Sequence, residues 1–152
     1  MTNIIIFPSI KKPVPVPVQV VDDSGLGSKY LATRDLSIKD IAKLVRADLK
    51  EKYSVKDGWK FSVRTSFFAG GCSISVDIKA APFVDIVNPL YLEWEKSIPT
   101  GCHDSDPKHY IEEIYNCMDC INNILEAFNY DHSDSMVDYF DVRFYSNVRV
   151  NL

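Results

Sequence analysis

The 152-residue sequence has little of what most enzymes and membrane proteins display. It contains four cysteines, three histidines and six glycines, and no apolar run near the roughly 20 residues that a membrane helix needs. It has no serine nucleophile elbow, no P-loop and no dinucleotide-binding glycine pattern. Its 17 basic and 21 acidic residues give a net charge of −4, which excludes a strongly basic chain. We therefore expect no membrane contact, no cofactor and no enzymatic activity.

Proline is unevenly spread, and its position divides the chain. Four of the eight prolines lie within the first 17 residues, and Pro13 to Val18 alternate proline with valine. Such a segment lacks every second N–H and is typical of polyproline II or of an edge strand. We predict a proline-rich arm over residues 1–28 and a single domain over residues 29–152, because about 150 residues is a common size for one domain.

Two stretches have the apolar spacing of amphipathic helices. After Ile38, apolar residues recur 3, 4, 7 and 11 positions later, and Ser37 with Asp40 resembles a capping box. From Ile111 to Phe128 they recur in steps of three and four. The sequence therefore predicts helices over Ser37–Tyr53 and Pro107–Phe128.

Strand patterns follow the first helix and return near the C-terminus. Residues 59–67 and 72–80 alternate apolar with polar side chains, and Ala69-Gly70-Gly71 between them suits a tight hairpin. Alternation resumes from Tyr139, and Ser146-Asn147 is expected to break that strand. The order arm-α-β-β-α-β predicts an α+β fold, in which two main helices cover one face of three antiparallel strands.

The polar positions of these strands would share the solvent-exposed face of the sheet. Short hydroxyls beside arginines can hold a polar ligand, and Arg64 with Arg143 could clamp a carboxylate or phosphate. The alternative is a lattice of cross-strand pairs. The candidate binding surface comprises Lys60, Ser62, Arg64, Ser73, Ser75, Asp77, Asp141, Arg143 and Tyr145.

The small net charge hides an asymmetry between the two halves. Residues 1–76 carry 12 basic and 7 acidic side chains, whereas residues 77–152 carry 5 and 14. A basic stripe on the first helix can meet phosphate groups, or it is simply a solvated face. The stripe consists of Lys39, Lys43, Arg46 and Lys50.

Cys117 and Cys120 have a spacing found in zinc sites, and Cys102 and His103 lie upstream. The pair falls inside a predicted helix, however, and not on a knuckle turn. Free cysteine often packs as a small apolar side chain, so we favour a structural role over metal binding.

Two stretches resemble a known family. The first includes Tyr30-Leu31-Ala32-Thr33, Phe61-Ser62-Val63-Arg64 and the hairpin glycines, and the second includes Asp138-Tyr139-Phe140-Asp141. Together they are similar to the large polyvalent protein associated domain that is twenty-ninth in its series, over about residues 29–150. The resemblance implies a domain of phage and conjugative-element proteins, and it supplies no catalytic residues.

We therefore expect a non-enzymatic binding module, linked to phage or mobile-element biology and located in the cytoplasm. A protein of unknown identity is the preferred partner. Nucleic acid, bound through the basic helix and the sheet face, is the first alternative, and a metal protein or enzyme is the second. The Ile4-Ile5-Ile6-Phe7 run could add to a sheet edge of a second copy, which leaves a homodimer open.

Overall fold

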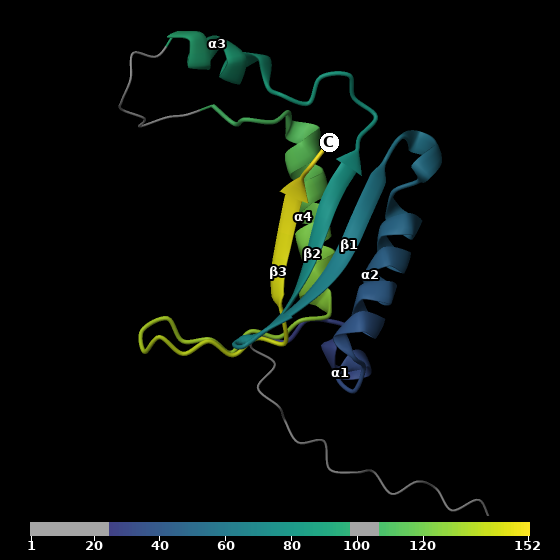
Figure 1. The fold of residues 1–152 in the computed structure, drawn as a ribbon, viewed down its shortest axis with the longest axis vertical. Coiled ribbons are helices and arrows are strands. Elements are labelled where there is room, and N and C mark those ends of the chain that lie inside the picture. Colours follow the sequence, from purple (N-terminus) through teal and green to yellow (C-terminus); the bar gives the residue numbers. More distant parts are fainter. Residues whose placement is uncertain (1–24, 98–106) are drawn as a thin grey trace, which may run out of the picture.

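A computed structural model describes residues 25–97 and 107–152 of the chain. Figure 1 shows a three-stranded sheet with α2 and α4 packed beside it, and α3 set apart beyond one end. The helices are α1 (Tyr30–Thr33), α2 (Ile38–Lys52), α3 (Pro89–Ser97) and α4 (Glu112–Ala127), with a short 3-10 helix over Val55–Asp57. The strands are β1 (Lys60–Phe68), β2 (Gly71–Ala80) and β3 (Tyr145–Val150). The α+β class is confirmed.

The sheet order is β1-β2-β3, and the sheet is mixed. β1 pairs antiparallel with β2, as the hairpin glycines predict. β3 pairs parallel with β2, from Ser73 opposite Tyr145 to Ile78 opposite Val150. The prediction of three antiparallel strands is therefore wrong for β3. The reason is the connection, because α4 carries the chain back along the sheet before β3 begins, and such a crossover returns a strand in the parallel sense.

β3 also begins later than the sequence pattern indicates. It starts at Tyr145 and runs through Ser146 and Asn147, where a break was expected. Residues 131–142 form an irregular loop held by isolated pairings. The buried Asn129 guides the chain into β3: its Nδ2 donates to the Phe144 carbonyl (3.0 Å), and its Oδ1 accepts the Phe144 N–H (3.2 Å). The alternation from Tyr139 therefore marks a loop with exposed aromatic side chains.

The two main helices follow their apolar seams. α2 is confirmed to within a residue at each end, and the Ser37 side chain accepts the Asp40 N–H as its cap. α4 begins at Glu112, five residues after the predicted start. The residues before it are extended, because the Ile111 N–H donates to the Ile86 carbonyl (2.9 Å) and Tyr110 pairs with Val87.

The core lies between the sheet and the two helices. Its fully buried members include Ile41, Val45 and Leu49 from α2, Ile74, Val76 and Ile78 from β2, and Ile121 and Leu125 from α4. In the described ranges, no helix is both long and apolar enough to cross a membrane.

Residues 25–28, which the sequence assigns to the arm, pair with the end of α4. The Gly27 N–H donates to the Asn129 carbonyl (2.9 Å), and the Lys29 N–H donates to the Ala127 carbonyl (2.7 Å). A Cβ on Gly27 would lie 2.1 Å from the Glu126 carbonyl oxygen, so this close approach requires glycine. The Pro-Val segment and the Ile4–Phe7 run lie outside the described residues.

Candidate binding surface

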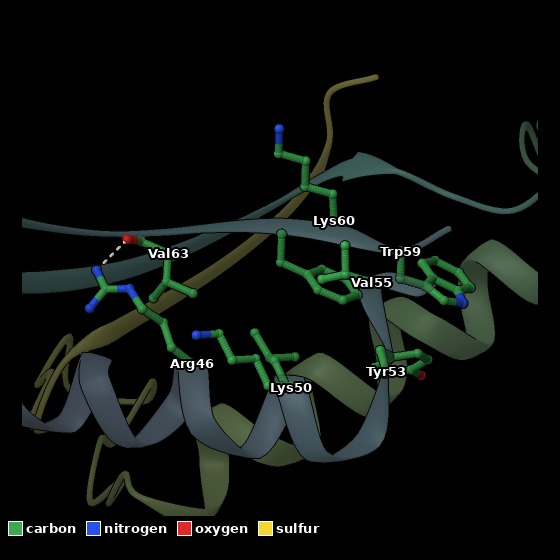
Figure 2. Close-up of a pocket in the computed structure, with 9 residues that line it drawn as sticks. Arg46, Lys50, Tyr53, Val55, Trp59, Lys60 and Val63 are labelled. Atoms are coloured by element: carbon green, nitrogen blue, oxygen red, sulfur yellow. Dashed lines mark hydrogen bonds between the residues drawn. The ribbon is translucent and has the colours of Figure 1, made fainter. Parts of the chain in front are cut away.

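The sheet face opposite α2 and α4 gathers most of the predicted surface. Because paired residues share a face, the register places Ser62 beside Asp77, Arg64 beside Ser75 and Ser73 beside Tyr145. The register shifts after Lys60 at the start of β1, and the Lys60 amino group points to the side of β1 away from α2 (Figure 2). We call this the open sheet face.

Asp141 and Arg143 lie away from the open sheet face, contrary to the sequence expectation, because β3 begins only after them. Arg143 binds the segment around α1: Nη1 donates to the Thr33 hydroxyl (3.1 Å) and the Phe128 carbonyl (2.9 Å), and Nη2 donates to the carbonyls of Thr33 and Leu36. Its guanidinium also stacks over the Tyr30 ring at 5.2 Å. Arg143 therefore holds the fold together and is not available as a ligand clamp.

Asn147 and Arg149 take the places expected for those two residues. They lie opposite Ser75 and Asp77 in the parallel pairing. Arg149 lines an open hollow of about 280 Å³ together with Arg64, Thr65, Ser66 and Ser75. The sequence signal was the alternation of Val148 and Val150, which places Arg149 on the face opposite those valines.

Asp77 is the acidic residue of the open sheet face, and it is buried, with only 1% of its surface exposed. Arg64 forms an ion pair with its Oδ2, and the Lys79 ammonium lies 3.9 Å from the same oxygen. Its Oδ1 has no hydrogen-bond partner among the described residues. Basic side chains cover this one carboxylate, so the accessible charge of the open sheet face is positive.

The predicted basic stripe of α2 borders the open edge of β1. A second hollow, of about 260 Å³, is lined by Lys39, Ala42, Lys43, Arg46 and Thr65. Arg46 fixes the helix to the strand, because its Nη2 donates to the Val63 carbonyl (2.7 Å). Lys43 contacts Asp40 at 2.7 Å, and this hydrogen bond lowers the pKa of the Asp40 carboxyl.

A third hollow continues from Arg46 toward the other end of α2. It has a volume of about 140 Å³, and its lining is largely apolar. Figure 2 shows Arg46 and Lys50 rising from α2 toward β1, with Tyr53 and Trp59 together at the far end. The amino group of Lys60 points to the other side of β1. We call this the aromatic hollow.

The three hollows adjoin one another around β1. The first and second share Thr65, and the second and third share Arg46. Their combined lining contains seven basic residues and no carboxylate. We call these seven the basic track: Lys39, Lys43, Arg46, Lys50, Lys60, Arg64 and Arg149. The nucleic-acid alternative from the sequence joined the α2 stripe with Lys60 and Arg64 of the sheet, and Arg149 is the member of the track that it lacked.

Two of the four residues of the zinc hypothesis, Cys117 and Cys120, lie on α4 and are wholly or partly buried. Cys117 is buried on α4 and Cys120 is half-buried, while Cys102 and His103 lie outside the described residues. Burial raises the pKa of the Cys117 thiol to about 11. Burial also raises the pKa of the neighbouring Tyr53 hydroxyl, which contacts both thiols. Among residues 25–97 and 107–152, no group of three His, Cys, Asp or Glu side chains is placed to hold a metal ion.

The Cys117 thiol is expected to resist alkylation in the folded protein. Its pKa lies about two units above the ordinary value of 9.0, so at pH 8 the thiolate is about a hundredfold scarcer than in an unfolded chain. Reaction with iodoacetamide, followed by peptide mass spectrometry, should therefore be at least about a hundredfold slower in buffer than in denaturant. Equal rates in the two conditions would contradict the buried, protonated thiol.

The comparisons with known proteins give one result. Residues 36–123 match the family model described as large polyvalent protein associated domain 29, which is more than half of the chain. The chain belongs to this family. No curated protein and no solved structure matches the chain.

The part matched to domain 29 runs from the cap of α2 into α4 and therefore includes the β1–β2 hairpin. It includes six residues of the basic track and excludes Arg149, which lies on β3. The Tyr30–Thr33 and Asp138–Asp141 segments, which also carry the sequence resemblance, lie outside the match. Membership in domain 29 associates the chain with large polyvalent proteins and leaves its specific role open.

Proposed function

We propose that this domain 29 chain is a non-enzymatic binding module whose basic track holds a strand of nucleic acid. The observation that carries the proposal is the extent of the track: seven cations line three adjoining hollows without a carboxylate in the lining, and two of them, Arg64 and Lys43, also pair with Asp77 and Asp40. A phosphate backbone presents one negative charge at every nucleotide, so it matches a row of cations better than a single anion does.

The segregation of charge on α2 supports the same conclusion. Lys39, Lys43, Arg46 and Lys50 are on the side of α2 that lines the hollows beside β1. Asp48 and Glu51 line a different hollow, together with Lys29 and Lys52. Asp48 also forms an ion pair with Lys29 at 2.5 Å. Asp40 pairs with Lys43 beside the track, whereas Asp48 and Glu51 lie away from it, so the flank of α2 that faces the track carries an excess of basic residues.

The protein partner favoured by the sequence becomes the second candidate. That hypothesis placed Asp141 and Arg143 on the binding face, where they would have mixed acidic and basic contacts. With Arg143 bound to the α1 segment and Asp77 buried, the accessible surface favours a uniformly anionic partner. An acidic protein segment is therefore the alternative that an experiment must separate from nucleic acid.

The test is fluorescence anisotropy with a labelled single strand of about 20 nucleotides, titrated with the full chain between about 50 and 200 mM salt. The track variant carries Lys39→Gln, Lys50→Gln and Arg149→Gln. The control carries Arg34→Gln, Lys96→Gln and Lys108→Gln, which remove the same charge outside the track. We expect the track variant to bind about tenfold or more weakly, with a salt slope shallower by about two, because three phosphate contacts are lost.

Three outcomes would overturn the proposal. The first is the absence of a complex at low salt. The second is an equal loss of affinity in the track variant and the control. The third is equally tight binding of poly-glutamate of similar charge, which would assign the track to an acidic protein instead.

A further inference from the structure

The aromatic hollow differs from the rest of the track. Its walls are apolar and aromatic, whereas the first two hollows are lined mainly by cations and short polar side chains. Trp59 and Phe61 stack with their ring centroids 5.9 Å apart and their planes 7° from parallel. Tyr53 packs against both, at 5.1 Å from Trp59 and 5.4 Å from Phe61. Apolar aromatic walls do not stabilise a phosphate group. The hollow therefore suits an apolar or aromatic part of the ligand.

Its size and mouth limit what can enter. The volume of about 140 Å³ is close to the roughly 150 Å³ of a protein cavity that accepts benzene, so one flat ring fits. Val55, with 72% of its surface exposed, stands in the lining beside Trp59 and Lys60. Arg46 holds the opposite wall through its hydrogen bond to the Val63 carbonyl.

The cations around the hollow indicate which substituents the bound ring carries. Arg46 and Lys50 bring cations to the hollow, the amino group of Lys60 points to the other side of β1, and none of the lining residues is a carboxylate. Lysine and arginine donate hydrogen bonds and have no acceptor, so they suit ring carbonyl oxygens and flanking phosphates. A flat ring that carries carbonyl oxygens and is linked to phosphates is a pyrimidine nucleotide. A purine, with two fused rings, is larger than the benzene that a cavity of this volume accepts, so a pyrimidine is the closer fit.

We propose that the aromatic hollow receives one unpaired pyrimidine base of the strand on the basic track. This inference rests on the proposed nucleic-acid function and adds to it a preference for one class of base. A base in a duplex is stacked and paired, and its withdrawal costs free energy, whereas a base in a single strand is free to stack on an aromatic side chain. The module therefore prefers single strands with accessible pyrimidines over duplexes.

The test compares four probes of equal length by anisotropy: oligo-dT, oligo-dA, a duplex, and an abasic strand that keeps the phosphates. We expect oligo-dT to bind about tenfold or more tightly than the abasic strand, since base stacking on aromatic residues has about that effect. In a Trp94→Phe background, oligo-dT should quench the fluorescence of Trp59, whereas the abasic strand should not.

A pair of matched variants locates the base. Val55→Phe fills the mouth of the hollow, and Val84→Phe places the same bulk on a valine outside the track that is even more exposed. Val55→Phe should remove the preference for oligo-dT and leave abasic-strand binding unchanged, while Val84→Phe should change neither.

Equal affinities for the four probes would overturn the base site and leave the basic track intact as a backbone-binding surface. Failure of every probe to bind would overturn the proposed function itself. Binding of a phenylalanine-containing poly-glutamate peptide as tight as that of oligo-dT, with the same loss in Val55→Phe, would assign the hollow to a protein side chain.

Discussion

Val76→Asp should abolish cooperative folding. Val76 lies on the central strand, has no exposed surface, and faces the core formed with α2 and α4. The substitution buries a carboxylate among aliphatic side chains, at a cost of several kcal/mol even after protonation. The lost apolar burial adds about 1.5–3 kcal/mol. The sum approaches the roughly 5–15 kcal/mol that a whole domain has available.

The measurement is thermal unfolding followed by circular dichroism. Ser75→Asp is the matched control, because the neighbouring residue points to the open sheet face and lines the hollow that contains Arg64 and Arg149. We expect the control to unfold within a few degrees of the unmodified chain. A cooperative transition of Val76→Asp near that same temperature would refute the placement of the core.

Arg143→Met should destabilise the fold by about 2–4 kcal/mol, because it leaves several acceptors without their charged donor. The carbonyls of Thr33, Leu36 and Phe128 all accept from this one guanidinium. Methionine keeps most of the apolar stem, so the loss reports on the hydrogen bonds. For about 150 residues, the melting temperature should fall by roughly 5–15 °C.

Two further variants test whether the destabilisation by Arg143→Met comes from the hydrogen bonds of its guanidinium and not from the loss of a positive charge. Arg34→Met removes an arginine whose ion pair with Asp35 is exposed, and such pairs contribute at most about 1 kcal/mol. Arg143→Lys keeps the charge but lacks the planar fork that reaches several carbonyls, so it should rescue little of the loss. Equal melting temperatures for Arg143→Met and Arg34→Met would show that the contacts around α1 do not stabilise the fold.

The parts of the fold that depend on local pattern were predictable. The capping serine and the apolar spacing placed α2, and the alternation with its glycine turn placed the β1–β2 hairpin. The direction of β3 was not predictable in this way, because it depends on where α3 and α4 carry the chain. A period-2 pattern also failed at Tyr139 and Phe140, where loop aromatics alternate without a neighbouring strand.

In the candidate surface too, the residues placed by local pattern were predictable and those placed by distant contacts were not. Residues of the hairpin reached the open sheet face as expected, because a strand's alternation fixes its two faces. Arg143 could not be assigned from sequence, since its partners Thr33 and Leu36 lie about 110 positions away in the chain. The sequence joined the α2 stripe with the sheet in its nucleic-acid alternative, but the packing of α2 along the edge of β1 depends on the angle between a helix and a sheet, which no local pattern encodes.

The parallel pairing of β3 also affects how quickly the sheet can form. The β1–β2 hairpin joins neighbours in sequence, whereas Ser73 and Tyr145, which pair across β2 and β3, are 72 positions apart. Closing a longer loop costs more chain entropy, and domains rich in distant contacts fold more slowly. Arg149 reaches the basic track only when β3 docks, so the hollow that it shares with Arg64 is completed late in folding, after the hairpin that forms its other wall.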